Sequence, residues 1–160
     1  MRALAILWGT ALVGCGGSGS GLPADAGHDA APIGRLCDLG TATSPDETVV
    51  ASPSLDCATR VCVQVPLGRE LPAGSSYPPS GNGLCSAQCE TEADCERVPD
   101  SPCTTGFACG VVITVGPFCC QTFCVCKDYV VVPDGGQLPV PAACDPTNAN
   151  NTCCNLPGRC

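Results

Sequence analysis

The chain has 160 residues, 17 of them cysteine, and its 15 acidic and 7 basic side chains give a formal net charge of −8 at pH 7. A charge of this sign argues against binding to nucleic acid or to anionic lipid headgroups by electrostatic attraction. Because only 4% of the residues are aromatic, the chain buries little large side-chain area, and covalent cross-links must supply what a small apolar core cannot.

Residues 1–14 have the pattern of an export signal. A basic Met1-Arg2 precedes the apolar run 3–13, which as a helix would span about 16 Å, roughly half of the hydrocarbon core of a bilayer. The run is therefore too short for a membrane span and fits the apolar region of a signal peptide.

The run ends in Leu12-Val13-Gly14-Cys15, which resembles the lipobox of bacterial lipoproteins. The resemblance implies that Cys15 receives a diacylglyceryl group, that the chain is cut between Gly14 and Cys15, and that the new amino group is acylated. Two or three acyl chains, at about 0.8 kcal/mol per buried CH₂, would anchor the protein stably in a bilayer. The next residue is Gly16 rather than the Asp that favours retention in the inner membrane, so the resemblance implies the outer membrane, on its periplasmic or surface face. The alternative is a secreted protein with Cys15 in a disulfide or removed with the leader.

The number of cysteines supports a separate role for Cys15. An odd number leaves one thiol over in an exported protein. Without Cys15 the number is even, and an oxidising compartment favours eight disulfides. The cysteines expected to form them are Cys37, Cys57, Cys62, Cys85, Cys89, Cys95, Cys103, Cys109, Cys119, Cys120, Cys124, Cys126, Cys144, Cys153, Cys154 and Cys160.

Residues 15–33 predict a flexible tether that begins at the lipidated cysteine, because Gly, Ser, Ala, Pro and Asp dominate there. The tether carries His28, the only histidine of the chain. Solvation explains a histidine in such a segment better than a catalytic or metal-binding role does.

A cysteine-rich domain is predicted over residues 34–132. Residues 48–50 and 61–65 are rich in β-branched side chains and predict short strands. Residues 91–94 can cap one or two helical turns, with Thr91 as the N-cap and Asp94 as an approximate capping-box partner.

A β-hairpin is predicted from residues 110–115, the turn Gly116-Pro117 and a second strand over 118–132. On that second strand Cys120, Cys124 and Cys126 would share one face and Cys119 would point to the other. The adjacent Cys119 and Cys120 should therefore form bridges to different partners.

Residues 133–160 predict a Pro/Gly linker and a cysteine-containing tail. The sixteen cysteines fall into groups of three (37–62), nine (85–126) and four (144–160). Since the first group is odd, at least one of its bridges must reach another group, which favours one body over 37–126. The pairing itself stays open, because sixteen cysteines allow about two million combinations.

Metal binding is the main alternative use of so many cysteines. The dense group has no Cys-x2-Cys pair and no histidine, and export implies an oxidising compartment, so neither structural zinc nor metallothionein-like storage is favoured. The alternating carboxylates Glu90, Glu92, Asp94 and Glu96 have the spacing of a calcium loop, but Cys95 stands where such a loop needs glycine. A solvated helix face explains the four carboxylates more simply, and no cofactor is expected.

An enzyme is not expected either, because the domain has no histidine to act as a base and each of its cysteines has a structural use. A disulfide-dense scaffold could present an exposed loop as a protease inhibitor, with Arg60 or Arg69 as the presented residue. Nothing in the sequence selects either arginine.

Three stretches, residues 57–64, 85–95 and 109–129, together resemble cysteine-rich lipoproteins of Gram-negative bacteria with large genomes. The resemblance implies a cell-envelope lipoprotein and no defined activity. We therefore expect a small disulfide-rich fold of short β-strands, a hairpin and loops with little helix. It would act as a non-catalytic binding or structural domain at the envelope, with a protein or glycan as ligand. The alternative is the protease inhibitor.

Overall fold

The computed structural model describes residues 32–134, 136–148, 151 and 153. Its elements are β1 (Leu36–Asp38), β2 (Val49–Ala51), β3 (Val61–Gln64), β4 (Asn82–Ser86), η1 (Glu92–Asp94), β5 (Phe107–Val111), β6 (Thr122–Cys126) and η2 (Ala142–Cys144). The predicted fold class, a small disulfide-rich protein of short strands and loops with little helix, is confirmed. The predicted signal peptide and the tether as far as residue 31 lie outside the described residues.

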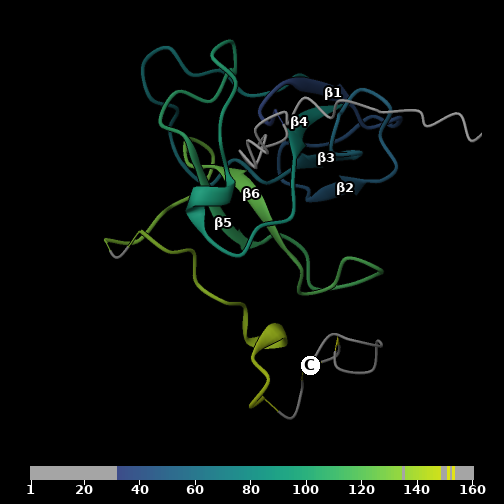
Figure 1. Cartoon of the computed structure of the whole chain (residues 1–160), viewed down its shortest axis with the longest axis vertical. Coiled ribbons are helices and arrows are strands. Elements are labelled where there is room, and N and C mark those ends of the chain that lie inside the picture. Colours follow the sequence, from purple (N-terminus) through teal and green to yellow (C-terminus); the bar gives the residue numbers. More distant parts are fainter. Residues whose placement is uncertain (1–31, 135, 149–150, 152, 154–160) are drawn as a thin grey trace, which may run out of the picture.

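The first four strands form an antiparallel sheet in the order β1-β4-β3-β2 (Figure 1). The two strands predicted in this region are its β2 and β3, which pair with each other. Successive side chains of a strand point to opposite faces, so the opposed pair Val63 and Leu84 lies on one face and the opposed pair Cys62 and Cys85 lies on the other. The sheet therefore has one aliphatic face and one face that carries disulfides.

The second sheet is the hairpin β5–β6, in which Cys109 lies opposite Cys124. The chain continues from β4 along the outer side of β6, where the Cys124 N–H donates to the Ala87 carbonyl at 3.0 Å and the Cys89 N–H donates to the Thr122 carbonyl at 3.3 Å. The continuation of β4 thus joins the two sheets, and in Figure 1 the hairpin lies to one side of the first sheet, next to β4.

The hairpin differs from its prediction in position. Its strands are 107–111 and 122–126, not 110–115 and 118–132. Cys119 and Cys120 lie in the turn between the strands, where the Cys120 N–H donates to the Ile113 carbonyl at 3.0 Å and the Cys120 backbone has φ of 59°. A residue in the left-handed region cannot continue a strand, so the predicted common face of Cys120 with Cys124 is wrong.

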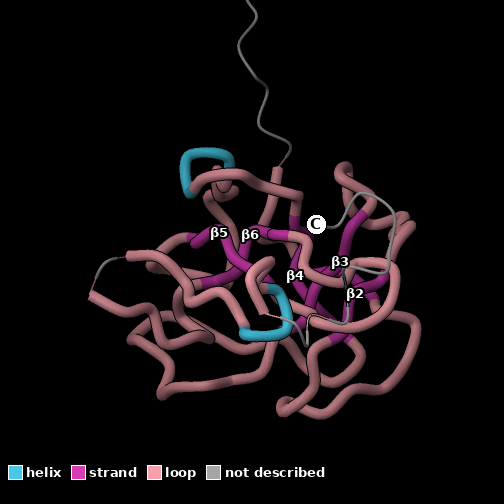
Figure 2. The backbone as a smooth tube through the Cα atoms, turned by 90° about the horizontal axis from the view of Figure 1, so that it is seen from below, coloured by secondary structure: helices cyan, strands magenta, loops and turns pink. Residues whose placement is uncertain are grey.

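The main core lies between the aliphatic face of the first sheet and the hairpin. Its buried members include Val63, Leu84, Phe107, Val125 and Tyr129. A second buried cluster occupies the other face of the first sheet and consists mostly of cysteine. The strands occupy the middle of the molecule and long loops surround them (Figure 2), so the small core is enclosed mainly by irregular chain.

The predicted helical turn is present as η1, a single 3₁₀ turn capped as expected. The Asp94 carboxylate accepts the Thr91 N–H at 2.8 Å and the Glu90 N–H at 2.9 Å. The Cys95 N–H closes the turn on the Glu92 carbonyl at 3.0 Å. The capping-box spacing therefore identified this turn correctly.

Candidate functional site

The sixteen cysteines beyond residue 36 were the main candidate residues, and the structure places seven disulfides among them. Each bridge joins residues 20 to 34 positions apart, and closing a loop of this length restricts the unfolded chain by about 3–4 kcal/mol. The bridges are Cys37–Cys62, Cys57–Cys85, Cys89–Cys109, Cys95–Cys124, Cys103–Cys126, Cys119–Cys153 and Cys120–Cys144. Cys15, Cys154 and Cys160 lie outside the described residues.

Three of the bridges connect the cysteine groups of the sequence. Cys57–Cys85 leaves the first group, as the odd count requires. Cys119 and Cys120 bond to Cys153 and Cys144 in the last group. The adjacent pair thus has different partners, as predicted, but the reason is the turn in which both residues lie and not opposite faces of a strand.

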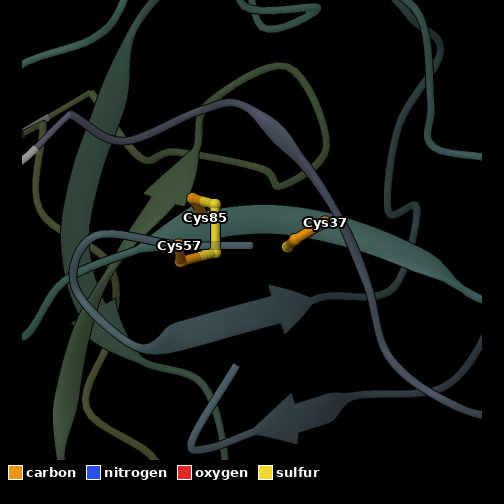
Figure 3. A group of neighbouring side chains, drawn as sticks. All are labelled: Cys37, Cys57 and Cys85. Carbon is orange, nitrogen blue, oxygen red and sulfur yellow. A yellow bond between two sulfur atoms is a disulfide. The ribbon is translucent and has the colours of Figure 1, made fainter. Parts of the chain in front are cut away.

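Sulfur atoms gather where bridged cysteines face each other across a pair of strands. Figure 3 shows Cys57 bonded to Cys85 with Cys37 beside them, and the three Sγ atoms lie within 4.8 Å of one another. Such a spacing would suit a metal ion if the sulfurs were thiolates. In this structure all three are disulfide sulfurs, so the cluster is a stack of two bridges across β1, β4 and β3.

The same holds for the other sulfur clusters of the described residues. Cys89, Cys95 and Cys124 form one, and Cys119, Cys120 and Cys153 form another. Every one of these cysteines belongs to a disulfide. Zinc binding would require these bridges to be reduced. The measurement of free thiols at the end of the Discussion distinguishes zinc binding from disulfides.

The four alternating carboxylates do not point to one centre. The Asp94 carboxylate caps η1, and Glu92 forms an ion pair with Lys127 of the hairpin. Glu90 and Glu96 are exposed. Two of the four carboxylates therefore hold the turn in place, which supports the structural explanation of the run over a calcium loop.

A buried carboxylate that the sequence did not single out is Asp128. Its side chain is fully buried and accepts hydrogen bonds from the Thr104 N–H at 2.6 Å, the Thr105 N–H at 3.1 Å and both threonine hydroxyls. Burial alone would raise its pKa, but the hydrogen bonds from Thr105, Thr104 and Ser75 together lower the pKa to about 2. The charged Asp128 carboxylate thus holds the loop that precedes β5 in place through hydrogen bonds.

Two tyrosines close the core beside this carboxylate. Tyr77 and Tyr129 pack edge to face with ring centroids 5.0 Å apart. The Tyr77 hydroxyl donates to the Val65 carbonyl at 2.6 Å and the Tyr129 hydroxyl to the Ser76 carbonyl at 2.8 Å. Burial raises the pKa of both phenols. Neither hydroxyl is poised as a base, and both act as donors that hold loops to the sheets.

The two arginines of the inhibitor alternative are both exposed. Arg60 has φ of 62° and lies in a turn in which its N–H donates to the Cys57 carbonyl at 3.0 Å. This left-handed backbone differs from the extended backbone that can add to a protease cleft as a strand. Arg69 lies in a loop held by the hydrogen bond from the Gly68 N–H to the Tyr129 carbonyl at 2.7 Å. The inhibitor alternative stays a prediction.

The structure also forms a groove that the sequence did not reveal. It has a volume of about 460 Å³ and is lined by three separate segments of the chain, residues 90–92, 109–111 and 136–140, together with Thr122. The first segment is acidic and the third is apolar at Leu138, Pro139 and Val140. No local pattern could have shown this groove, because its walls are more than 40 residues apart in the chain.

The predicted lipidation site at Cys15 and the tether histidine His28 lie outside the described residues. In the part of the chain that is described, no helix is long and apolar enough to cross a membrane. Neither a family model, nor a curated protein, nor a solved structure matches the chain.

Proposed function

We propose that the protein is an exported lipoprotein, lipidated at Cys15, whose disulfide-stapled body is a non-catalytic binding or structural module of the bacterial outer membrane. The observation that carries this proposal is the use of the cysteines. All fourteen cysteines that the structure describes are disulfide-bonded, which suits an oxidising compartment. If Cys154 and Cys160 also pair, Cys15 alone is left over.

The position of Cys15 supports lipidation as its use. It follows an apolar run of signal-peptide length and the small residue Gly14, and a small residue at that place lets a peptidase approach the backbone. The residues after it are rich in Gly, Ser and Ala, which suits a flexible link between a bilayer and the stapled body. Several acyl chains on this one residue would supply a membrane affinity that the acidic body lacks.

The test is fractionation of the full chain expressed in a Gram-negative host. The wild-type protein should be found in the outer-membrane fraction, with a mass that shows loss of residues 1–14 and gain of acyl chains. Cys15→Ala should leave the membrane fraction or accumulate as the precursor, and Ser18→Ala, three residues further on, should behave as wild type. Full retention of Cys15→Ala in the membrane would overturn the anchor.

A further inference from the structure

The outer edge of β5 is unpaired among the residues that the structure describes. The Lys127 N–H donates to the Gly106 carbonyl, and with the register of the hairpin this places Ala108 and Gly110 in hydrogen-bonded pairs with β6. The N–H and C=O groups of Cys109 and Val111 therefore point away from β6. Within the part of the chain that the structure describes, no hydrogen bond reaches these groups and no strand pairs with this edge.

The groove described above follows this edge, because residues 109–111 line it between two walls. The wall formed by residues 90–92 lies on the face of the hairpin that carries Cys109 and Cys124. The Cys89–Cys109 and Cys95–Cys124 bridges attach this wall to the hairpin. The other wall stands on the opposite face, because Leu138 packs directly against Gly110. A Cβ at Gly110 would lie only 2.5 Å from the Leu138 Cδ1.

The two walls differ in chemistry. One carries Glu90 and Glu92, and no basic residue lines the groove. Glu92 is already paired with Lys127, whereas the exposed Glu90 has no ion-pair partner among the described residues. The other wall presents Leu138, Pro139 and Val140, of which Val140 is 65% exposed. A strand laid along β5 would direct successive side chains alternately to the acidic and to the apolar wall.

We propose that this groove binds an extended segment of a partner protein in which basic and apolar residues alternate, and that the segment adds to β5 as a further strand. Main-chain hydrogen bonds to Cys109 and Val111 supply affinity, and the two walls select the side chains. The proposal rests on the proposed function, since it names the partner of the binding module. The bridges fix the acidic wall before the partner arrives, which limits the ordering cost of binding.

Charge argues against a second copy of this chain as the occupant. Two β5 edges that pair antiparallel in a continuous sheet would bring the acidic walls of both copies to the same face, where Glu90 and Glu92 of each would repel those of the other. The body as a whole is acidic, so a basic segment is also favoured at long range.

The test measures peptide binding to the full, exported, detergent-solubilised protein by fluorescence anisotropy. The probe is a labelled peptide of alternating Lys and Val, and its controls are alternating Glu and Val, a peptide with the same Lys and Val in two blocks, and an alternating peptide with N-methylated amides. We expect only the first to bind, with competition by its unlabelled form. Equal binding of the block or N-methylated peptide would overturn strand addition, and no binding at 1 mM would overturn the site.

Variants of the protein then locate the binding. Glu90→Lys should weaken binding at least fivefold, whereas Glu96→Lys, an exposed acidic residue outside the groove, should change it less than twofold. Val111→Pro removes an outward N–H without touching the pairs at Ala108 and Gly110, and should weaken binding at least tenfold. Val131→Pro is its exposed control. Unchanged binding by both Glu90→Lys and Val111→Pro would contradict the proposal.

Three further outcomes are distinguishable in the same preparation. Self-association that Val111→Pro abolishes would show that a second copy occupies the edge and would overturn the proposed partner. Protein that fractionates with the outer membrane but binds no peptide would overturn this inference alone. Protein that binds the peptide but is not membrane-bound would overturn the proposed anchor alone.

Discussion

At the scale of single residues, Gly83 shows how the bridges constrain the sheet. Gly83 lies on β4 opposite Cys37 of β1, and the Cys37–Cys62 bridge passes over it to reach β3. A Cβ at this position would lie 2.7 Å from the Val63 carbonyl oxygen and 3.2 Å from the Cys62 Sγ. The close approach of the three strands therefore depends on the absence of a side chain here.

Gly83→Ala should lower the free energy of unfolding by about 1–3 kcal/mol, because the new methyl group overpacks a site bounded by backbone. Denaturant unfolding with the disulfides intact would measure this. Gly68→Ala is the matched control, since a Cβ there meets the Tyr129 carbonyl at an ordinary 3.5 Å, and it should change the free energy by less than about 0.5 kcal/mol. Equal effects of the two substitutions would contradict the account of the bridge.

Asp128 should make the free energy of unfolding depend on pH in the acidic range. Its pKa is lowered to about 2 from the ordinary value of 3.8, so the stabilisation is fully present above pH 4 and is lost as the pH falls through the folded-state pKa near 2. The free energy of unfolding should fall by about 2 kcal/mol over this range. Asp128→Asn should lose this part of the pH dependence, and the exposed Asp134→Asn should keep it. Parallel pH profiles of wild type and Asp128→Asn would show that another group is responsible.

At the scale of elements, the sequence predicts those strands that have a local signature. β2 and β3 are rich in valine, and residues 48–50 and 61–65 were predicted close to their observed positions. β1 and β4 have the sequences Leu-Cys-Asp and Asn-Gly-Leu-Cys-Ser, with no β-branched run. Cys37 of β1 is bonded to Cys62 of β3, and Cys85 of β4 is bonded to Cys57. These are contacts between distant residues that no local pattern contains.

The hairpin strands differ from their predicted positions also because of contacts between residues that are distant in the chain. Val112, Ile113 and Val115 have high strand propensity, but the chain here turns toward the C-terminal segment. The Cys153 Sγ lies 3.4 Å from the Thr114 carbonyl, and Cys120 is bonded to Cys144. Asp128 was missed for a similar reason, since its donors Thr104 and Thr105 lie more than 20 residues away in the chain.

The bridges of the hairpin should differ in how much they contribute to resistance to proteolysis. Cys124 is buried on β6 and its bridge to Cys95 fixes η1 to the core, so the double variant Cys95→Ser, Cys124→Ser should lose global resistance to proteolysis. Cys120 lies in the turn and its bridge holds only the C-terminal segment.

The matched variant Cys120→Ser, Cys144→Ser should therefore be cut only beyond about residue 132. The two double variants remove one bridge each and leave no new free thiol. Limited proteolysis followed by mass spectrometry distinguishes them. Global degradation of the second variant, or resistance of the first, would contradict this ranking.

At the scale of the whole molecule, the disulfides supply stability that a large apolar core would otherwise give. The chain has too few large apolar side chains to form such a core. Two of the disulfides lie within the first sheet and its loops, three fasten the chain between β4 and β5 to the hairpin, and two join the loop of the hairpin to the C-terminal segment. Composition and cysteine number were enough to predict this class of fold. They were not enough to predict the groove along β5, because its position depends on which cysteines pair.

The central claim is that every cysteine after Cys15 is paired and that Cys15 is used in another way. The most direct measurement is thiol alkylation of the full protein, purified from the envelope, under denaturing and non-reducing conditions and read by intact mass. We predict no alkylated thiol, with and without a chelator, and a lipid mass on an N-terminal Cys15. Four or more thiols that become reactive only after chelation would show a metal site in place of disulfides and would contradict the account.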